Sequence, residues 1–487
     1  MTETRAKIVA TLGPASFPPA VLESMARTGV DVFRLNGAHT PPARVAGLVR
    51  RVRAVGRRVG RDLGVMLDLP GVKVRCGAVA DGALIVKPGE RLDLAPVRGP
   101  RAGVVPVPRS VFRDLVPGAE VLLSDGTVVL RVVERGRTSA RTRVEAGGTI
   151  RDRVGVHVRG AFHPGAVLTR LDLELACVGA AAGVDALAIS FVRGPDDVRR
   201  LRRVLERAPV RMPLLVGKLE RREAVENLDA TLDACDGVMV ARGDLGLEYG
   251  PEEVPGLQKR ILEAASRHGR FAITATQMLE SMTTAARPTR AEASDVANAV
   301  FDGTDAVMLS GETAVGAHPA LVVATMNRIL AAAEADPHCP FAGDPRIPGP
   351  DADARRPDRL VVRAAVRLAM DARAAAVVVF TRGGQSARRL AKERPRAPIF
   401  AYAREPEVVR GLLMSWGVRP RHLPARGSTD AVLRTVMSSL AREQRLRRGD
   451  RVVLVMGGAE DPAGTTSLIK LVTLGREARA ARTTARR

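Results

Sequence analysis

The sequence predicts an α/β protein with a (β/α)₈ TIM barrel, a small β-barrel domain inserted in one barrel loop and a three-layer α/β domain at the C-terminus. Eight short apolar runs alternate with stretches of helical periodicity, a pattern typical of parallel strands joined by helices. A Val-, Gly- and Pro-rich segment interrupts this alternation after the third run. Further apolar runs follow a Pro- and Asp-rich stretch later in the chain.

The length of the chain agrees with several domains. A chain of 487 residues, 46% of them hydrophobic, can bury large cores, and at about 100 to 200 residues per domain it suggests roughly two to four domains. We expect the barrel at 1–72 and 165–340, the inserted β domain at 73–164, a linker at 341–357 and the C-terminal α/β domain at 358–487.

The barrel strands are expected at eight apolar runs. These are "KIVATLG" (7–13), "VDVFRLN" (30–36), "GVMLDL" (64–69), "ALAISFV" (186–192), "PLLVGKLE" (213–220), "GVMVARG" (237–243), "FAITATQ" (271–277) and "AVMLSGE" (306–312). Amphipathic helices are expected between most of them, at 18–28, 42–58, 169–182, 195–206, 252–268, 290–302 and 318–334. Thr289 precedes the sixth of these helices and Glu292 lies in its first turn, as in a capping box.

The other two domains have their own patterns. Alternating runs separated by glycines, such as "EVLLSDGTVVLRVVERG", predict β-hairpins in the inserted segment. Beyond the linker "DPRIPGPDADARRPDR", the runs "AAVVVF", "APIFAYA" and "RVVLVMG" alternate with helical stretches. They predict a separate α/β domain.

The composition excludes several classes of protein. The first residues, "MTETRAKIVATLGPAS", lack an apolar stretch of signal-peptide length, and no run approaches the roughly 18 apolar residues of a membrane span. We therefore expect a cytoplasmic protein with no membrane partner. The four cysteines show no C-x-x-C spacing, which argues against a zinc knuckle or disulfide framework and indicates reduced thiols.

The charge of the chain is unusual. A formal net charge of +23 suggests a nucleic-acid partner. However, the Arg residues are spread over the chain and only 3% of residues are aromatic, so few rings can stack on bases. We expect no specific nucleic-acid binding. Only seven of the 76 basic residues are lysines, which draws attention to each lysine near a strand end.

Charged and polar residues follow the ends of most predicted barrel strands. Because the C-terminal ends of barrel strands meet at one mouth, these side chains are expected to lie in one cleft. They are Arg34, Asn36, Asp68, Lys73, Arg75, Lys218, Glu220, Asp244, Thr276 and Glu312. A lone K-x-E such as Lys218 and Glu220 is commonly a surface ion pair of little consequence. Glu312 is equally suited to capping backbone amides, so the prediction rests on the set.

The chemistry of this set is that of a site for a phosphorylated anion. The carboxylates of Glu220 and Asp244, on neighbouring strands, suit an octahedral Mg²⁺ completed by substrate oxygens and water. Arg34, Arg75 and Lys218 suit phosphoryl oxygens. The backbone amides of "ARGDLG" (241–246) can bind a carboxylate.

These motifs resemble those of the pyruvate kinase family. The run "ATQMLESM" followed by "RPTRAEASDVANAVFDGTDAVMLSGETAVG", with "VMVARGDLG" and "RLNGAH" in the same order, is highly specific. The resemblance covers the barrel well, the C-terminal domain moderately and the inserted domain weakly. It implies phosphoryl transfer from phosphoenolpyruvate to ADP, which gives pyruvate and ATP in the last step of glycolysis.

The resemblance also implies residue roles. Glu220 and Asp244 would bind Mg²⁺, or Mn²⁺ in its place, and Lys218 would stabilise the transferring phosphoryl group. The implied substrate-binding residues are Arg34, Lys218, Gly243, Asp244 and Thr276, and the implied catalytic residues are Arg34, Lys218 and Thr276. The implied nucleotide-binding residues are Asn36, His39, Arg75 and Arg153.

The monovalent-cation site departs from the family's pattern. Ala38 stands where the family has a Ser that binds the cation, and Lys73 stands where enzymes that need K⁺ commonly have Glu. We expect the Lys73 ammonium to lie near Asn36 and Asp68 and to replace K⁺, so that K⁺ is not required. The alternative is a surface lysine without a partner.

Two further departures concern the site entrance. Leu69 and Pro70 replace the usual Thr and Lys, and Val154 stands where the inserted domain usually has a basic residue, although Arg153 is adjacent. Two other functions therefore stay open. One is a metal-dependent lyase acting on phosphoenolpyruvate or pyruvate, which would not need Lys218. The other is a catalytically weak sensor.

Regulation and assembly are suggested by the resemblance. The Gly-rich loops at 381–386 and 457–467 follow predicted strands and could bind the phosphate of an allosteric effector, or they are ordinary turns. The resemblance also implies a homotetramer.

Overall fold

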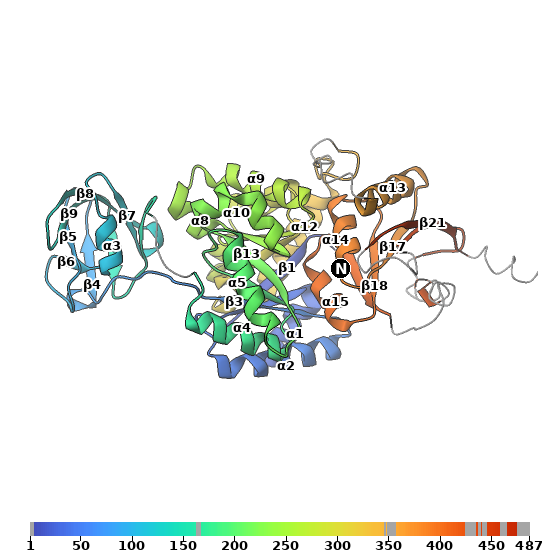
Figure 1. Cartoon of the computed structure of the whole chain (residues 1–487), viewed down its shortest axis with the longest axis horizontal. Helices are drawn as coiled ribbons and strands as arrows, with labels where there is room; N and C mark the ends of the chain where they lie inside the picture. Colours follow the sequence, from blue (N-terminus) through green and yellow to red (C-terminus); the bar gives the residue numbers. More distant parts are fainter. Residues whose placement is uncertain are drawn as a thin grey trace, which may run out of the picture.

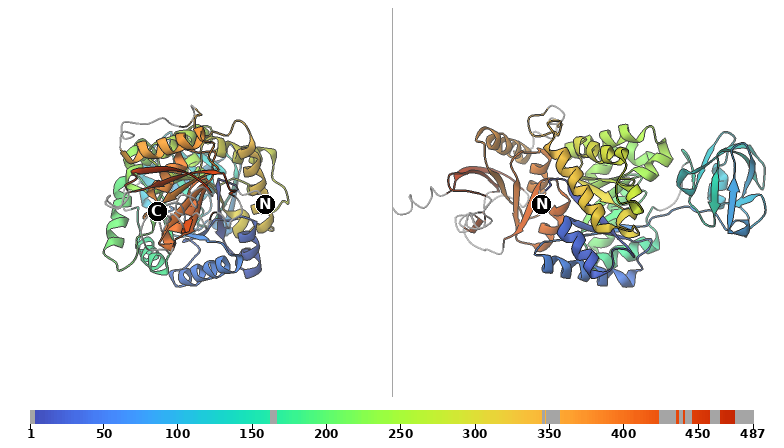
Figure 2. Two further views of the ribbon diagram at one scale, coloured as in Figure 1. Left: turned by 90° about the vertical axis from the view of Figure 1, so that its right-hand side faces the viewer. Right: turned by 180° about the vertical axis from the view of Figure 1, so that it is seen from behind.

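The computed structural model describes residues 4–161, 167–344, 347, 357–423, 435–436, 440, 446–457 and 465–474. Three bodies lie in a row along its longest axis, with the barrel in the middle (Figure 1). The inserted domain extends from one end of the barrel and the C-terminal domain packs against the other, as Figure 2 also shows. Within the described residues, no helix has the length and apolar character of a membrane span.

The barrel is a closed sheet of eight parallel strands, which confirms the predicted fold class. The strands are β1 (Lys7–Leu12), β2 (Val32–Asn36), β3 (Gly64–Leu69), β12 (Ala186–Ile189), β13 (Leu214–Leu219), β14 (Gly237–Ala241), β15 (Phe271–Ala275) and β16 (Ala306–Leu309). Their order around the barrel is β1-β16-β15-β14-β13-β12-β3-β2. An inner apolar cluster contains residues from all eight strands together with Leu413 and Met414 of the C-terminal domain. The barrel interior is therefore a packed core, not a channel.

Helices surround this sheet. Those predicted are α1 (Pro19–Thr28), α2 (Pro42–Val59), α4 (Arg170–Ala182), α5 (Pro195–Glu206), α9 (Val254–Arg267), α10 (Arg290–Phe301) and α12 (Pro319–Ala335). Four were not predicted: α6 (Arg222–Glu226), α7 (Leu228–Ala234), α8 (Arg242–Tyr249) and α11 (Gly311–Ala314). Thr289 and Glu292 form the expected capping box at the start of α10.

Several strands end earlier than predicted, because the chain turns where the polar residues begin. Phe191, Thr276 and Gln277 have positive φ angles of 55°, 68° and 52°. This conformation costs roughly 1 to 2 kcal/mol for a residue with a Cβ atom. Such strain is tolerated where surrounding contacts fix the backbone, and here it aims the strand-end side chains into the barrel mouth.

The inserted domain consists of two sheets around one core. Six strands have the order β11-β7-β8-β9-β5-β6, and β10 pairs with β4. The strands are β4 (Ala83–Val86), β5 (Arg91–Ala95), β6 (Val104–Pro106), β7 (Glu120–Leu123), β8 (Val128–Arg135), β9 (Ala140–Ala146), β10 (Gly148–Arg151) and β11 (Val156–Val158), with one helix, α3 (Arg109–Asp114). Val86 of β4 and Ile150 of β10 belong to the same buried cluster as Leu94 and Leu130 of the larger sheet.

The C-terminal domain is a five-stranded sheet in the order β19-β18-β17-β20-β21, with β21 antiparallel. Its strands are β17 (Ala376–Phe380), β18 (Ile399–Ala403), β19 (Val418–His422), β20 (Arg451–Met456) and β21 (Leu468–Thr473), and its helices are α13 (Pro357–Asp371), α14 (Gln385–Lys392) and α15 (Pro406–Gly411). Along β17, Val377 and Val379 enter one buried cluster, whereas Ala376 and Val378 enter another. The sheet is therefore covered on both faces, as a three-layer domain requires.

Much of the predicted linker lies outside the described residues. Its first residue, Phe341, is 6% exposed and its ring packs edge-on against Trp416 at 6.0 Å between centroids. The backbone N–H of Ala342 donates to the carbonyl of Arg394. The chain therefore stays packed on the C-terminal domain at the point where a linker was expected to begin.

Four aspartates line the barrel end that faces the C-terminal domain, and we call them the basal aspartates. Asp31, Asp185, Asp236 and Asp305 precede β2, β12, β14 and β16. Each carboxylate accepts a hydrogen bond from a backbone N–H near the start of the preceding strand, from Ile8 (3.0 Å), Val65 (2.7 Å), Leu215 (2.9 Å) and Ala272 (2.8 Å) respectively. Each also pairs with a cation. The barrel supplies Arg61, Arg53 and Arg202 to the first three, and the C-terminal domain supplies Arg410 to Asp185 and Lys392 to Asp305.

Candidate active site

Lys218, near the end of β13, holds its ammonium among three oxygen atoms. Nζ donates to Ser190 Oγ at 2.7 Å, and it lies 2.9 Å from Glu220 Oε1 and 3.4 Å from Asp68 Oδ1. Burial disfavours the charged form, but Asp68 and Glu220 outweigh burial and raise the pKa of Lys218 above its usual value. Lys218 is therefore a permanent positive charge held in a fixed position.

Arg34 and Asp68 form a second charged pair beside it. Nε and Nη2 of Arg34 lie 2.8 Å and 2.6 Å from Asp68 Oδ2, and Nη1 donates to Thr11 Oγ1 at 3.1 Å. Burial opposes ionisation of Asp68, but Lys218 and Arg34 prevail and hold the pKa of this carboxyl below its usual value. Two cations thus share one buried carboxylate where β2, β3 and β13 end.

Glu220 is 1% exposed and accepts a hydrogen bond from the backbone N–H of Phe191 at 2.7 Å. Its other oxygen, Oε1, has Lys218 nearby but no well-formed hydrogen bond. Burial raises the pKa of Glu220, and the negative charge of Asp244 raises it further. The positive charge of Lys218 lowers it, but does not outweigh these two effects. A cation shared by the two carboxylates would relieve this cost.

The residues present fit a hard cation such as Mg²⁺. Glu220 and Asp244 supply oxygen only, as Mg²⁺ prefers. Among the described residues, no group of three or more His, Cys, Asp and Glu side chains is arranged to hold a metal ion. A metal at these two carboxylates would therefore take its remaining ligands from substrate and water, which is the usual arrangement for Mg²⁺ in phosphoryl-transfer sites.

Gly243 and Asp244 lie in the first turn of α8, not in a loop. The N–H of Gly243 donates to Thr276 Oγ1 at 2.9 Å, and this hydroxyl donates to the carbonyl of Ala275 at 2.6 Å. The amide expected to bind a substrate carboxylate is therefore bonded to Thr276. The hydroxyl holds the start of α8 against the end of β15.

Arg242 anchors the same turn and was missed by the sequence analysis. It is 8% exposed, pairs with Asp295 at 2.7 Å and donates to the carbonyl of Thr276 at 2.6 Å. These contacts hold Thr276 in its positive-φ conformation. The only sequence signal for this role is an arginine directly before "GDLG".

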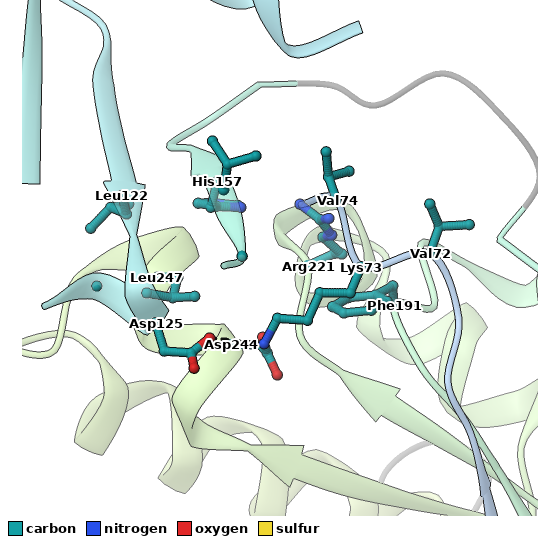
Figure 3. A pocket seen from close by; sticks show the side chains of 13 residues that line it. Val72, Lys73, Val74, Leu122, Asp125, His157, Phe191, Arg221, Asp244 and Leu247 are labelled. Atoms are coloured by element: carbon teal, nitrogen blue, oxygen red, sulfur yellow. Dashed lines mark hydrogen bonds and ion pairs between the residues drawn. The ribbon is translucent and has the colours of Figure 1, made fainter. Parts of the chain in front are cut away.

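Lys73 does not lie where the sequence analysis expected it. Its Nζ forms an ion pair with Asp125 of the inserted domain at 2.8 Å, and the two side chains are 38% and 74% exposed. The expectation of an ammonium beside Asn36 and Asp68 is therefore corrected, as is the alternative of a lysine without a partner. The reason is that β3 ends before Lys73, and the chain then leaves the barrel toward the inserted domain. Lys73 nonetheless lines a pocket with Asp244 (Figure 3).

The turn after β2 holds two further predicted residues. Asn36 and Asp68 are register partners on β2 and β3, but the side chain of Asn36 accepts a hydrogen bond from the N–H of Ala38 at 3.1 Å. His39 is exposed in the same turn. Both residues stand at the barrel mouth, beside the strands that carry Arg34 and Asp68.

Arg75 and Arg153 are brought together by the inserted domain. Arg75 donates to the carbonyl of Arg153 at 3.0 Å. A cleft of about 480 Å³ opens beside them. Its lining includes the residues Lys73, Arg75, Arg151, Asp125, Ser124, Thr127 and Thr149. Arg151 rather than Arg153 belongs to this lining, because Arg153 has a positive φ of 55° and turns the chain. The sequence analysis named Arg153 as a nucleotide contact and did not single out Arg151.

Glu312 has a structural role. It is fully buried, and its carboxylate accepts hydrogen bonds from the backbone N–H groups of Ser310 (2.6 Å) and Leu279 (3.1 Å). The alternative of amide capping is therefore confirmed. The contact ties the loop after β15 to the loop after β16.

Ser190 was also missed. It follows β12, accepts a hydrogen bond from Lys218, and donates to Asp68 Oδ1 at 3.4 Å. A polar residue at the end of the apolar run "ALAIS" is a weak sequence signal for this role. The predicted strand 186–192 includes Ser190, which hides its position at a strand end.

The two Gly-rich segments of the C-terminal domain are only partly described. The hydroxyls of Ser386 and Thr466 lie 2.6 Å apart, and the N–H of Gly384 donates to Thr381 at 2.9 Å. These contacts bring one loop beside part of the other. Residues 458–464 of the predicted effector site lie outside the described residues.

Comparison with known proteins gives consistent matches. Residues 3–323 match the family model for the pyruvate kinase barrel domain, and residues 359–472 match that for the pyruvate kinase α/β domain. A pyruvate kinase of Mycobacterium tuberculosis is 40% identical over 476 residues, which cover 97% of this chain and 99% of that protein. One of Methylorubrum extorquens is 36% identical, with 97% and 98% covered.

A solved structure is similar over the same extent. The crystal structure of a pyruvate kinase from Cryptosporidium parvum superposes with a TM-score of 0.88 at 30% identity. The match covers 97% of each chain. The similarity thus includes the inserted and C-terminal domains as well as the barrel.

Proposed function

This chain belongs to the pyruvate kinase family, and we propose that the barrel mouth around Lys218 is where it transfers the phosphoryl group of phosphoenolpyruvate to ADP. The family membership makes it a phosphotransferase that forms pyruvate and ATP. The observation that carries the assignment of the site is the ammonium of Lys218, held between Asp68, Ser190 and Glu220.

Lys218 and Arg34 act on the phosphoryl group. In-line transfer spreads negative charge over the equatorial oxygens of the transferring group, and a cation fixed beforehand stabilises that charge without reorganisation. Lys218 meets this requirement because three oxygens hold its ammonium in position. Arg34, fixed by Asp68 and Thr11, orients the phosphate of the bound substrate.

Glu220 and Asp244 are the residues that would hold Mg²⁺, with Mn²⁺ as a substitute. When bound, the metal neutralises the substrate carboxylate and phosphate and polarises the bond that breaks. Oε1 of Glu220, which lacks a well-formed hydrogen bond, is the oxygen available to it.

Thr276 positions the proton that converts the enolate to pyruvate. Its hydroxyl is too weak an acid to supply this proton itself, but it is bonded to the N–H of Gly243 beside Asp244. Binding of the substrate carboxylate at this N–H would release the hydroxyl to orient a proton donor. The role is therefore one of positioning.

The nucleotide binds between the barrel mouth and the inserted domain. Arg75, Arg151 and Lys73 line a cleft whose size and positive charge suit the phosphates of ADP. His39 and Asn36 border the mouth on the barrel side. Arg153 supports Arg75 through its carbonyl group rather than by a direct phosphate contact.

K⁺ is not required in this proposal. Ala38 lacks the hydroxyl that would bind a monovalent cation, and Lys73 brings a positive charge to the pocket that Asp244 also lines. To act there, the Lys73 ammonium must exchange its contact with Asp125 for one in the site. Both side chains are partly exposed, so this exchange costs little.

Further proposals concern the setting of the enzyme. The contacts between Ser386 and Thr466 and between Gly384 and Thr381 support a phosphate-binding effector loop in the C-terminal domain. We also propose a homotetramer in the cytoplasm, by analogy with the family. Light scattering tests the tetramer, and a screen of phosphorylated metabolites for changes in the substrate half-saturation tests the effector.

A coupled assay of pyruvate formation tests the main proposal. Phosphoenolpyruvate, ADP and Mg²⁺ should give pyruvate and ATP in equal amounts. Pyruvate formed without ADP would favour the lyase. No pyruvate above background, with substrate binding retained, would favour the sensor.

A further inference from the structure

One carboxylate oxygen of Glu248 contacts a histidine of the inserted domain and an arginine of the barrel. Glu248 lies in α8, one helical turn after Asp244, and is 2% exposed. Its Oε2 lies 3.1 Å from Nε2 of His157, on β11 of the inserted domain, and 3.4 Å from Nη1 of Arg221, on the barrel. Burial would raise the pKa of Glu248, but His157 and the neighbouring arginines keep it below its usual value. Glu248 is therefore an anion that depends on both partners.

Arg221 links Glu248 to Glu220, one of the two proposed metal ligands. It directly follows Glu220 in the chain, and its guanidinium lies over the ring of Phe191, 5.2 Å from the centroid. Phe191 has a positive φ and donates its backbone N–H to Glu220 Oε2 at 2.7 Å. Figure 3 shows Arg221 beside Phe191, with His157 nearby and Asp244 across the pocket.

The chain segment that leads from β3 into the inserted domain packs on the ring of Phe191. A Cβ atom at Gly71 would lie only 2.9 Å from Cδ2 of Phe191, so the backbone of Gly71 is in close contact with it. Phe191 is thus held between this segment and Arg221. Its strained backbone keeps the N–H aimed at Glu220 because both sides of the ring are supported.

We propose that His157 is a positioning residue that couples the docking of the inserted domain to the geometry of the Glu220–Asp244 pair. The coupling runs from His157 to Glu248, from Glu248 to Arg221, and from Arg221 to Phe191 and Glu220. This inference rests on the proposed role of Glu220 and Asp244 as metal ligands. It goes beyond that role because it gives the inserted domain an effect on the metal site in addition to its contacts with the nucleotide.

The physical argument depends on the shared oxygen. The Arg221–Glu248 pair joins the residue next to Glu220 to the helix that carries Asp244, so it sets the spacing of the two carboxylates. While His157 Nε2 lies 3.1 Å from Oε2 of Glu248, it takes part of the charge of that oxygen. Arg221 then stays 3.4 Å from the same oxygen, with its guanidinium 5.2 Å from the ring centroid of Phe191. Without His157, the full charge of a buried carboxylate attracts Arg221, which then moves away from the ring and carries the backbone of Glu220 with it.

A second contact between the same two elements provides a control. Arg159, two residues after His157, donates its Nε to the carbonyl of Leu247 at 3.3 Å. It also holds the inserted domain against α8, but it reaches a backbone carbonyl rather than the carboxylate of Glu248. Loss of Arg159 therefore loosens docking without changing the partners of Arg221.

The test is a titration of the full-length protein with Mn²⁺, followed by electron paramagnetic resonance without substrates. We expect His157→Ala to weaken Mn²⁺ binding about tenfold, as loss of a residue that orients a metal ligand typically does. His157→Gln, which keeps an N–H donor for Glu248, should recover binding to within about twofold. Arg159→Ala should leave Mn²⁺ affinity unchanged while raising the KM for ADP.

A double variant gives an independent readout. If the coupling runs through Arg221, His157→Ala combined with Arg221→Met should bind Mn²⁺ no more weakly than Arg221→Met alone. The proposal would be overturned if the two substitutions weakened Mn²⁺ binding by the product of their separate factors. Equal loss of Mn²⁺ affinity in His157→Ala and Arg159→Ala would also overturn it. Since Mn²⁺ binding is measured without turnover, a failure of the proposed phosphoryl transfer would leave this test interpretable.

Discussion

The two ends of the barrel use buried charge in opposite ways. At the base, each of the basal aspartates accepts a backbone N–H and pairs with a cation. At the mouth, Glu220 keeps an oxygen without a well-formed hydrogen bond, and Lys218 and Arg34 are concentrated on one carboxylate. Strained residues with positive φ occur at the mouth ends of β12 and β15. The base thus maintains the fold, and the mouth concentrates paired charges where a ligand can bind.

We expect the largest effect from a substitution at the barrel mouth, and we expect it to change catalysis but not stability. We expect Lys218→Met to lower turnover by about a thousandfold or more while substrate binding changes little, because its charge acts mainly in the transition state. Steady-state kinetics and a direct phosphoenolpyruvate titration check this. Thermal unfolding should show a folded protein. Turnover near that of the wild type would remove Lys218 from its assigned role.

The base should respond in stability instead. Asp185→Asn removes the buried carboxylate that Arg53 and Arg410 share and leaves Arg410 only the exposed Glu407 at 3.6 Å, which should cost about 3 kcal/mol of unfolding free energy. Denaturant unfolding measures this change, and kcat at 25 °C should be unaltered. The matched control is Asp196→Asn, since Asp196 pairs with Arg199 on the surface with 91% exposure and should be nearly neutral. A large loss of kcat in folded Asp185→Asn would contradict the division between the two ends.

A metal-ligand substitution should affect two binding steps together. Asp244→Ala should weaken both Mg²⁺ and phosphoenolpyruvate by about ten- to a hundredfold, because the metal would bridge protein and substrate. Calorimetric titrations of each ligand, with and without the other, provide the measurement. Weakening of one ligand alone would show that the metal is not shared.

The smallest effect concerns the monovalent cation. With Mg²⁺ present, activity in K⁺ and in a bulky organic cation should agree within about twofold if, as proposed, Lys73 exchanges Asp125 for a contact in the site. Lys73→Glu should lose most activity, with K⁺ restoring it only in part because Ala38 provides no ligand. Activation of the wild type many-fold by K⁺ would overturn this expectation while leaving the phosphoryl-transfer proposal intact.

The fold could be predicted because its signals are local. Apolar runs of the correct length and spacing mark all eight strands, and the capping box of Thr289 and Glu292 marks the start of α10. The strand ends were less predictable, because positive φ at Phe191 and Thr276 depends on contacts from other elements. Apolar periodicity carries no information about such turns.

The site was predictable where residues belong to rigid strands. Lys218, Glu220, Arg34 and Asp68 lie at strand ends and came together as expected. Lys73 did not, because its position depends on the path of the chain into the inserted domain. Three residues were missed because their roles depend on contacts with residues distant in the sequence: Ser190, Arg242 and Arg151.

The basal aspartates also bear on how the barrel folds. Three of their bonds to a preceding strand close short stretches of chain, with separations of 23, 21 and 33 residues. The bond between Asp185 and Val65 spans 120 residues, because the inserted domain lies between β3 and β12. Closing a loop about five times longer costs roughly 1.5 kcal/mol more in chain entropy.

That longest bond is also the one in which two arginines, Arg53 and Arg410, pair with the aspartate. One comes from the barrel and the other from the C-terminal domain. We therefore expect the seam between β3 and β12 to close last during folding, after the inserted domain has shortened the loop and the C-terminal domain has supplied its arginine. The part of the chain beyond the insertion would then be needed before the first three strands are held in place.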